Sequence, residues 1–112
     1  MLEPLIIEEA VNGVINLKDI TDFATAIISV VPLNPHPHDE AEAFIGKGEG
    51  EDMDRLGTVE IEPGQPSELR VHRNVLLKYS TNTPIWFYYD FIHGENGNPQ
   101  PSDKTFYRIV LA

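Results

Sequence analysis

Hydrophobic and polar residues alternate with a period of two along most of this chain, and turn-forming residues interrupt the alternation about every ten residues. This pattern is typical of the strands of an all-β sandwich or barrel. The expected strands cover Leu5–Ile7, Asn12–Leu17, Phe23–Pro32, Ala41–Gly48, Leu56–Glu62, Glu68–His72, Pro84–His93 and Lys104–Ala112. A helical turn competes at Arg73–Tyr79, where Val75, Leu76 and Tyr79 would share one side.

The segment Pro84–His93 combines strong alternation with the highest density of aromatic residues. Its two faces are expected to carry Ile85, Phe87, Tyr89 and Phe91 on one side and Trp86, Tyr88, Asp90 and Ile92 on the other. The turn formers that follow it lead back into the last strand, which predicts a hairpin. We expect the first face to form the core of the sandwich, with Ile28, Val30 and Ile109 among its partners.

The second face of this strand allows two interpretations. In one of them, long loops or the neighbouring strand cover Trp86, Tyr88 and Tyr107, since lone aromatic residues on a sheet face are common and indicate no function by themselves. In the other, these side chains form an exposed aromatic platform that stacks on sugar rings or anchors a protein partner.

Composition narrows the classes of partner. The chain has 112 residues, which suits one domain, 1–112, and it carries a formal net charge of −10. This charge repels phosphate backbones and anionic membrane surfaces, so neither nucleic acid nor membrane insertion is expected. The absence of cysteine excludes disulfides and thiolate metal sites. The N-terminus lacks a basic region followed by a long apolar run, and is not expected to be a signal peptide.

The order of motifs resembles the immunoglobulin-like repeat modules of large bacterial surface adhesins. The resemblance rests on "EEAVNGVINLKDI", "DFATAIISVVP", "YYDFIHGENGNPQPS" and the closing "TFYRIVL", which are packing and turn motifs spread over nearly the whole chain. It implies an immunoglobulin-like antiparallel β-sandwich of about seven strands, at the cell surface or outside the cell. The chain departs from the family in its longer loop through Asn34–His38 and in the strand that follows it.

Two functions remain open from the sequence. The resemblance implies a non-catalytic module for adhesion or spacing, with neighbouring modules as partners. A stand-alone lectin-like or protein-binding accessory subunit, associated with a toxin or a phage tail, is the alternative, with a carbohydrate or protein partner. The chain shows no Ser–His–acid set and no phosphate-binding glycine loop, so it is not expected to be an enzyme.

Three sets of residues are candidate sites. The ligand-binding candidates are Trp86, Tyr88, Asn96, Asn98 and Gln100, and the loop of Glu95–Pro101 is expected beside the loop of His36 and His38. Those two histidines, followed by Asp39 and Glu40, are also a candidate for a zinc or nickel site, with a solvated loop as the alternative. Carboxylates from Lys18–Asp22 and Lys47–Arg55 are expected at one pole, where calcium could bind: Asp19, Asp22, Glu49, Glu51, Asp52 and Asp54. A hydrated acidic loop without bound calcium is the alternative for this last set.

Overall fold

A computed structural model describes residues 3–29, 39–48, 52–62, 64–80, 83–92 and 98–111 of the chain. Strands dominate it, as the alternation predicts. In chain order the elements are β1 (Ile6–Ile7), β2 (Val14–Asn16), the 3-10 helix η1 (Leu17–Asp19), β3 (Phe23–Ile28), β4 (Glu40–Lys47), β5 (Asp52–Glu60), β6 (Ser67–His72), α1 (Arg73–Lys78), β7 (Ile85–Ile92), β8 (Gln100–Pro101) and β9 (Thr105–Val110).

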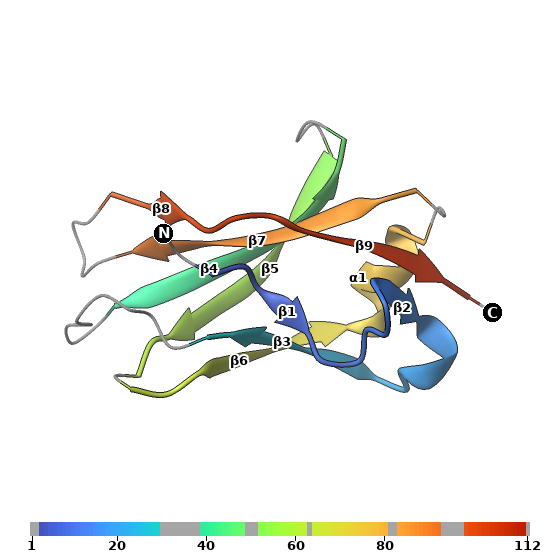
Figure 1. Cartoon of the computed structure of the whole chain (residues 1–112), viewed down its shortest axis with the longest axis horizontal. Helices are drawn as coiled ribbons and strands as arrows, with labels where there is room; N and C mark the ends of the chain where they lie inside the picture. Colours follow the sequence, from blue (N-terminus) through green and yellow to red (C-terminus); the bar gives the residue numbers. More distant parts are fainter. Residues whose placement is uncertain are drawn as a thin grey trace.

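The strands form two sheets that pack as an all-β sandwich (Figure 1). The small sheet has the order β1-β3-β6, and the large sheet has the order β2-β9-β7-β4-β5, with β8 paired to β7. The expected hairpin between the aromatic strand and the last strand is confirmed by the antiparallel pairing of β7 with β9. One pair departs from the antiparallel expectation, because the chain crosses to the large sheet after β1 and β2 then runs parallel to β9.

The core lies between the sheets and is centred on β7. The predicted inner face is confirmed, since Ile85, Phe87, Tyr89 and Phe91 are all buried. Ile28 and Ile109 belong to the same buried cluster, while the expected partner Val30 lies outside the described residues. The aromatic ring of Phe87 meets that of Tyr107 edge-on, with 5.6 Å between the ring centroids. This geometry is a favourable one for aromatic pairs.

The segment before β2 is bonded to the large sheet by three side chains. The Tyr107 hydroxyl accepts a hydrogen bond from the amide of Ile7 at 3.1 Å. The Thr105 hydroxyl donates to the Leu5 carbonyl at 2.6 Å, and the Tyr89 hydroxyl donates to the Glu3 carbonyl at 2.9 Å. The N-terminal segment therefore connects the two sheets as well as forming the edge of the small one.

The Tyr89 hydroxyl predicts a loss of stability at alkaline pH. Burial, and secondarily the negative charge of Glu3, raises the pKa of Tyr89 to about 12 from its ordinary value of 10.0. The native state thus holds this proton more tightly than the unfolded state, so the contribution of Tyr89 is complete below pH 10 and is lost as the pH rises toward 12. We expect denaturant midpoints to fall across this window, and to fall less steeply in Tyr89→Phe. Parallel curves for the two proteins would contradict the assignment.

Three local expectations differ from the structure or go beyond it. The expected acidic loop Lys47–Arg55 is wrong over its second half, because β5 begins at Asp52 and pairs there with β4. The competing helical turn does form as α1, in which Leu76 packs against the core. The Asn12-Gly13 pair makes the turn before β2, and both residues have positive φ angles, a conformation that Asn and Gly tolerate best.

Candidate functional site

The outer face of the large sheet carries a row of aromatic side chains. Alternation along β7 turns Trp86 and Tyr88 away from the core, and the pairing of β4 with β7 places Phe44 opposite Tyr88. The rings of Phe44 and Tyr88 are stacked at 5.1 Å, and the rings of Trp86 and Tyr88 lie 5.6 Å apart at an angle of 47°. Three strand positions on two strands thus form one continuous row of aromatic rings, in which Phe44 and Trp86 are buried.

Trp86 is covered, although it lies on the outer face. Its side chain and backbone together are 2% exposed, and its indole nitrogen donates a hydrogen bond to the Gly48 carbonyl at 3.0 Å. The Lys104 ammonium lies 4.3 Å from the centroid of the ring, a distance at which a cation and an aromatic face attract each other. The expectation of an exposed aromatic platform is therefore wrong for Trp86, and also for the buried Tyr107, while Tyr88 is half-buried.

A cavity of about 350 Å³ opens beside this covered tryptophan. Its walls combine apolar and polar side chains from β5, β7, β8 and the connection to β9. The lining residues are Met53, Trp86, Tyr88, Asp90, Pro101, Ser102 and Lys104. Its volume lies at the lower end of the range for small-molecule sites, and a few polar groups among apolar walls are the composition expected of such sites.

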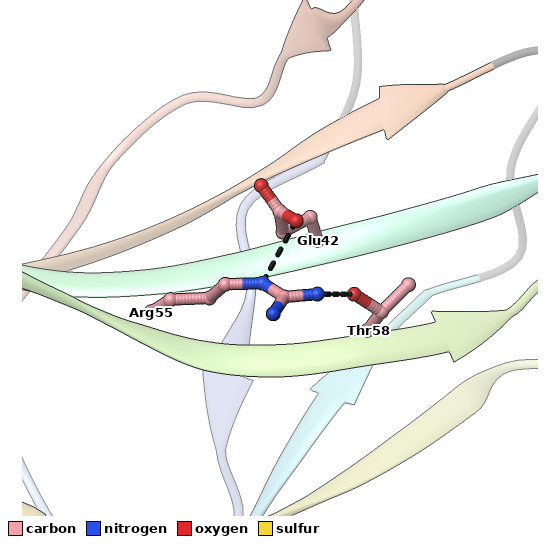
Figure 2. A network of polar contacts seen from close by, with 3 residues as sticks. All are labelled: Glu42, Arg55 and Thr58. Atoms are coloured by element: carbon pink, nitrogen blue, oxygen red, sulfur yellow. Dashed lines mark hydrogen bonds and ion pairs between the residues drawn. The ribbon is translucent and has the colours of Figure 1, made fainter.

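Two neighbouring carboxylates on this face, Glu42 and Asp90, are in different electrostatic situations. Glu42 on β4 lies directly opposite Asp90 on β7. Glu42 accepts a bond from the Arg55 side chain at 2.8 Å, and Arg55 also donates to Thr58 at 2.6 Å (Figure 2). The Asp90 carboxylate makes no hydrogen bond or ion pair with any residue that the structure describes.

The environment of Asp90 makes its carboxyl group a weaker acid than an exposed one. Its pKa is raised, chiefly by burial and then by the negative charge of Glu42. The pKa of Tyr88 is raised as well, first by burial and then by the charges of Asp90 and Glu42. Two ionisable side chains line the cavity, the carboxyl group of Asp90 and the ammonium group of Lys104.

Two other hollows differ in chemistry. One of about 540 Å³ is lined by Thr21, Asp22, Phe23, His72, Arg73 and Asn74. The Nε of Arg73 already donates hydrogen bonds within the protein, to the carbonyls of Leu17 and Ile20. The other, of about 410 Å³, surrounds Phe106 on the outer face and has Arg108 as its charged side chain. The first hollow also places a carboxylate, Asp22, beside the aromatic rings of Phe23 and His72, whereas the lining of the second contains no carboxylate.

The loop candidates fall around the cavity or outside the described residues. Gln100 is exposed on β8, next to Pro101, and Asn98 is exposed just before it. Asn96 lies outside the described residues, as do His36 and His38. The expected proximity of their two loops is therefore not described, but Glu40 and Ile92, which flank those loops, are register partners.

The calcium candidates do not form a site among the described residues. Asp54 is bonded through one carboxylate oxygen to the Lys78 ammonium at 2.9 Å and the Tyr79 hydroxyl at 2.8 Å, which lowers its pKa. Asp19 lies in η1, and Asp22 lies just before β3. No group of three or more His, Asp or Glu side chains that could hold a metal occurs in the described part of the chain. Glu49, Glu51 and the side chain of Asp52 lie outside it.

Several residues of the candidate site are not identified by the sequence analysis. Met53, Lys104 and Pro101 line the cavity, and Glu42 lies next to it, but no pattern in the sequence marks them as ligand-binding residues. The alternation of β4 does place Glu42 and Phe44 on the same face. The Glu42–Asp90 pair can be identified only when this shared face is combined with the register of β4 on β7.

Comparisons of the chain with known protein families, curated proteins and solved structures give no match. Among the described residues, no helix has the length and apolar character required to cross a membrane.

Proposed function

We propose that this protein is a non-catalytic binding module with an immunoglobulin-like fold, and that it takes its ligand in the cavity beside Trp86 and Tyr88. The observation that carries the proposal is the cavity of about 350 Å³, which joins aromatic walls to the Asp90 carboxylate, a group with no hydrogen-bonding or ionic partner among the described residues. Sites of this composition bind ligands by apolar contact and use a few polar groups for orientation. The resemblance to adhesin modules supports a location at a bacterial surface or in a secreted assembly as part of this proposal.

The strand distribution supports the immunoglobulin-like part of the proposal. In such sandwiches the second and fifth canonical strands share one sheet, while the third, sixth and seventh share the other. Here β3 and β6 lie in the small sheet, and β4, β7 and β9 lie in the large one. The chain also divides its first strand between the sheets, as β1 beside β3 and β2 beside β9. In this proposal, the inner face of the large sheet packs in the core, and its outer face binds the ligand.

The proposal predicts ligand binding that is reported by the only tryptophan of the chain. We suggest titrating the isotope-labelled protein with neutral oligosaccharides and with short blocked peptides of positive, negative and zero charge. At least one probe should change Trp86 fluorescence and shift the amide signals of 53, 86–90 and 101–104. Tyr88→Ala should weaken that binding about tenfold, the equivalent of about 1.4 kcal/mol, because it removes a cavity wall.

Phe106→Ala is the matched control. Phe106 is also an aromatic residue on the outer face, but it lies outside the cavity. The control should bind as the unmodified protein does, and thermal melts should show that both variants fold. Amide shifts confined to the hollow around Phe23 and His72, or the absence of any response to every probe, would contradict the proposed site.

A further inference from the structure

The charges around the cavity are unevenly compensated. Glu42 has an arginine partner in Arg55, which also bonds Thr58 and is thereby held on the side of β5 (Figure 2). Asp90, directly across the strand pair from Glu42, has no hydrogen-bonding or ionic partner in the described part of the chain. Arg55 thus neutralises only one of these two adjacent carboxylates, Glu42. The other carboxylate, Asp90, is the one that lines the cavity.

The walls around Asp90 strengthen its attraction for a cation. Tyr88, Met53 and Pro101 line the same cavity, so water reaches the carboxylate from fewer directions than at an open surface. An electrostatic interaction gains strength as the surrounding polarity falls. The raised pKa of Asp90, caused by burial and by Glu42, agrees with this picture. A cation in the cavity would offset the repulsion between Asp90 and Glu42.

The shape of the cavity favours a side chain over a sugar. Stacking on a sugar needs a free aromatic face, but Lys104 lies on the Trp86 ring and Phe44 is stacked with Tyr88. A guanidinium group needs less room, because it is flat, tolerates contact with aromatic rings and bonds a carboxylate through two parallel N–H groups. The volume of about 350 Å³ can hold one such side chain with its alkyl stem.

We propose that the cavity beside Trp86 accepts an arginine side chain of a basic partner protein, with Asp90 as its ionic partner and Tyr88 as an aromatic wall. This inference rests on the proposed function and names the ligand class of the same site. The formal net charge of −10 is complementary to a basic partner and speeds its association. A negatively charged ligand would meet both Asp90 and Glu42.

Because of Lys104, the proposal predicts opposite effects on affinity for two charge-removing substitutions in the cavity. Its ammonium already occupies the Trp86 side of the cavity, 4.3 Å from the ring centroid. An entering cation therefore meets attraction from Asp90 and repulsion from Lys104. Removal of the charge at Asp90 should weaken binding, and removal of the charge at Lys104 should strengthen it. An anionic ligand requires the opposite pair of signs, and a neutral ligand responds to neither through charge.

The test uses a short blocked peptide with one arginine and its counterparts with citrulline, a neutral isostere of arginine, and with glutamate. Trp86 fluorescence and amide shifts measure binding to the unmodified protein and to Asp90→Asn, Lys104→Gln and Glu68→Gln. Glu68 is an exposed acid on β6 of the small sheet, so its variant controls for net charge alone. Asp90→Asn should weaken arginine-peptide binding about tenfold, since a charge-assisted bond to the carboxylate is lost. Lys104→Gln should strengthen binding several-fold, and Glu68→Gln should leave it within about twofold of the unmodified protein.

The outcomes separate this inference from the proposed function. Equal binding of the arginine and citrulline peptides, or equal effects of Asp90→Asn and Glu68→Gln, would overturn the arginine assignment. Binding of an oligosaccharide or of the glutamate peptide at the cavity, without the arginine peptide, would overturn it too but leave the binding module intact. Failure of every probe to perturb the cavity would overturn both. If Asp90→Asn fails to fold, the citrulline comparison and Lys104→Gln still decide the matter.

Discussion

Phe87→Ala is expected to unfold the protein or to leave it barely stable. Phe87 is completely buried in the middle of β7, and its ring meets Tyr107 edge-on at 5.6 Å. Truncation of a buried phenylalanine costs about 3–5 kcal/mol, because it removes apolar contacts and leaves a cavity that the surroundings fill only partly. A domain has in total about 5–15 kcal/mol of stability, so this loss is a large share of it. Urea denaturation followed by circular dichroism measures the change.

Phe106→Ala provides the matched control for this prediction. It makes the same chemical change on the neighbouring strand, and Phe106 is the residue directly beside Trp86 in the pairing of β7 with β9. Phe106 is 60% exposed, so its truncation should change the free energy of unfolding by only about 0.5 kcal/mol. A similar decrease in the free energy of unfolding for the two variants would contradict the assignment of Phe87 to the buried inner face and Phe106 to the exposed outer face.

The sequence predicts the faces of strands better than their partners. The alternation of Ile85, Phe87, Tyr89 and Phe91 requires only local periodicity, and the structure confirms it. The start of β5 at Asp52 does not follow from local pattern, because its acidic residues are typical of a loop. They enter a strand because β4 provides a hydrogen-bonding edge along its whole length, from Glu40 to Lys47. Pairing between strands thus overrides local composition here.

The candidate site shows the same limit. Trp86 and Tyr88 can be selected from the sequence as outer-face aromatic residues. The cover over Trp86 depends on Lys104, which lies beyond the turn-forming stretch that follows β7. The Glu42–Asp90 pair depends on the register between β4 and β7, and a shift of one residue would turn one of these acids toward the core. Such contacts join residues far apart in the chain, and no periodicity specifies them.

The short strand β1 gives the second large prediction, because it has only two residues and they face opposite ways. Ile7 is 1% exposed and belongs to the core, whereas Ile6 is 48% exposed. Ile7→Ala should cost about 2–5 kcal/mol and Ile6→Ala less than about 1 kcal/mol, although the two changes are chemically identical and adjacent.

The reason for this difference is the position of β1 between the sheets. Its backbone pairs with β3, its Ile7 amide bonds the Tyr107 hydroxyl of β9, and the Ile7 side chain fills the space between them. Alanine keeps both backbone interactions, so the difference between the two variants isolates side-chain burial. Denaturant midpoints of the two variants, at equal dependence on denaturant concentration, give the comparison. If both changes prove equally mild, β1 is not a part of the cooperative core, and the bonds from Tyr89, Thr105 and Tyr107 to the N-terminal segment contribute little to folding.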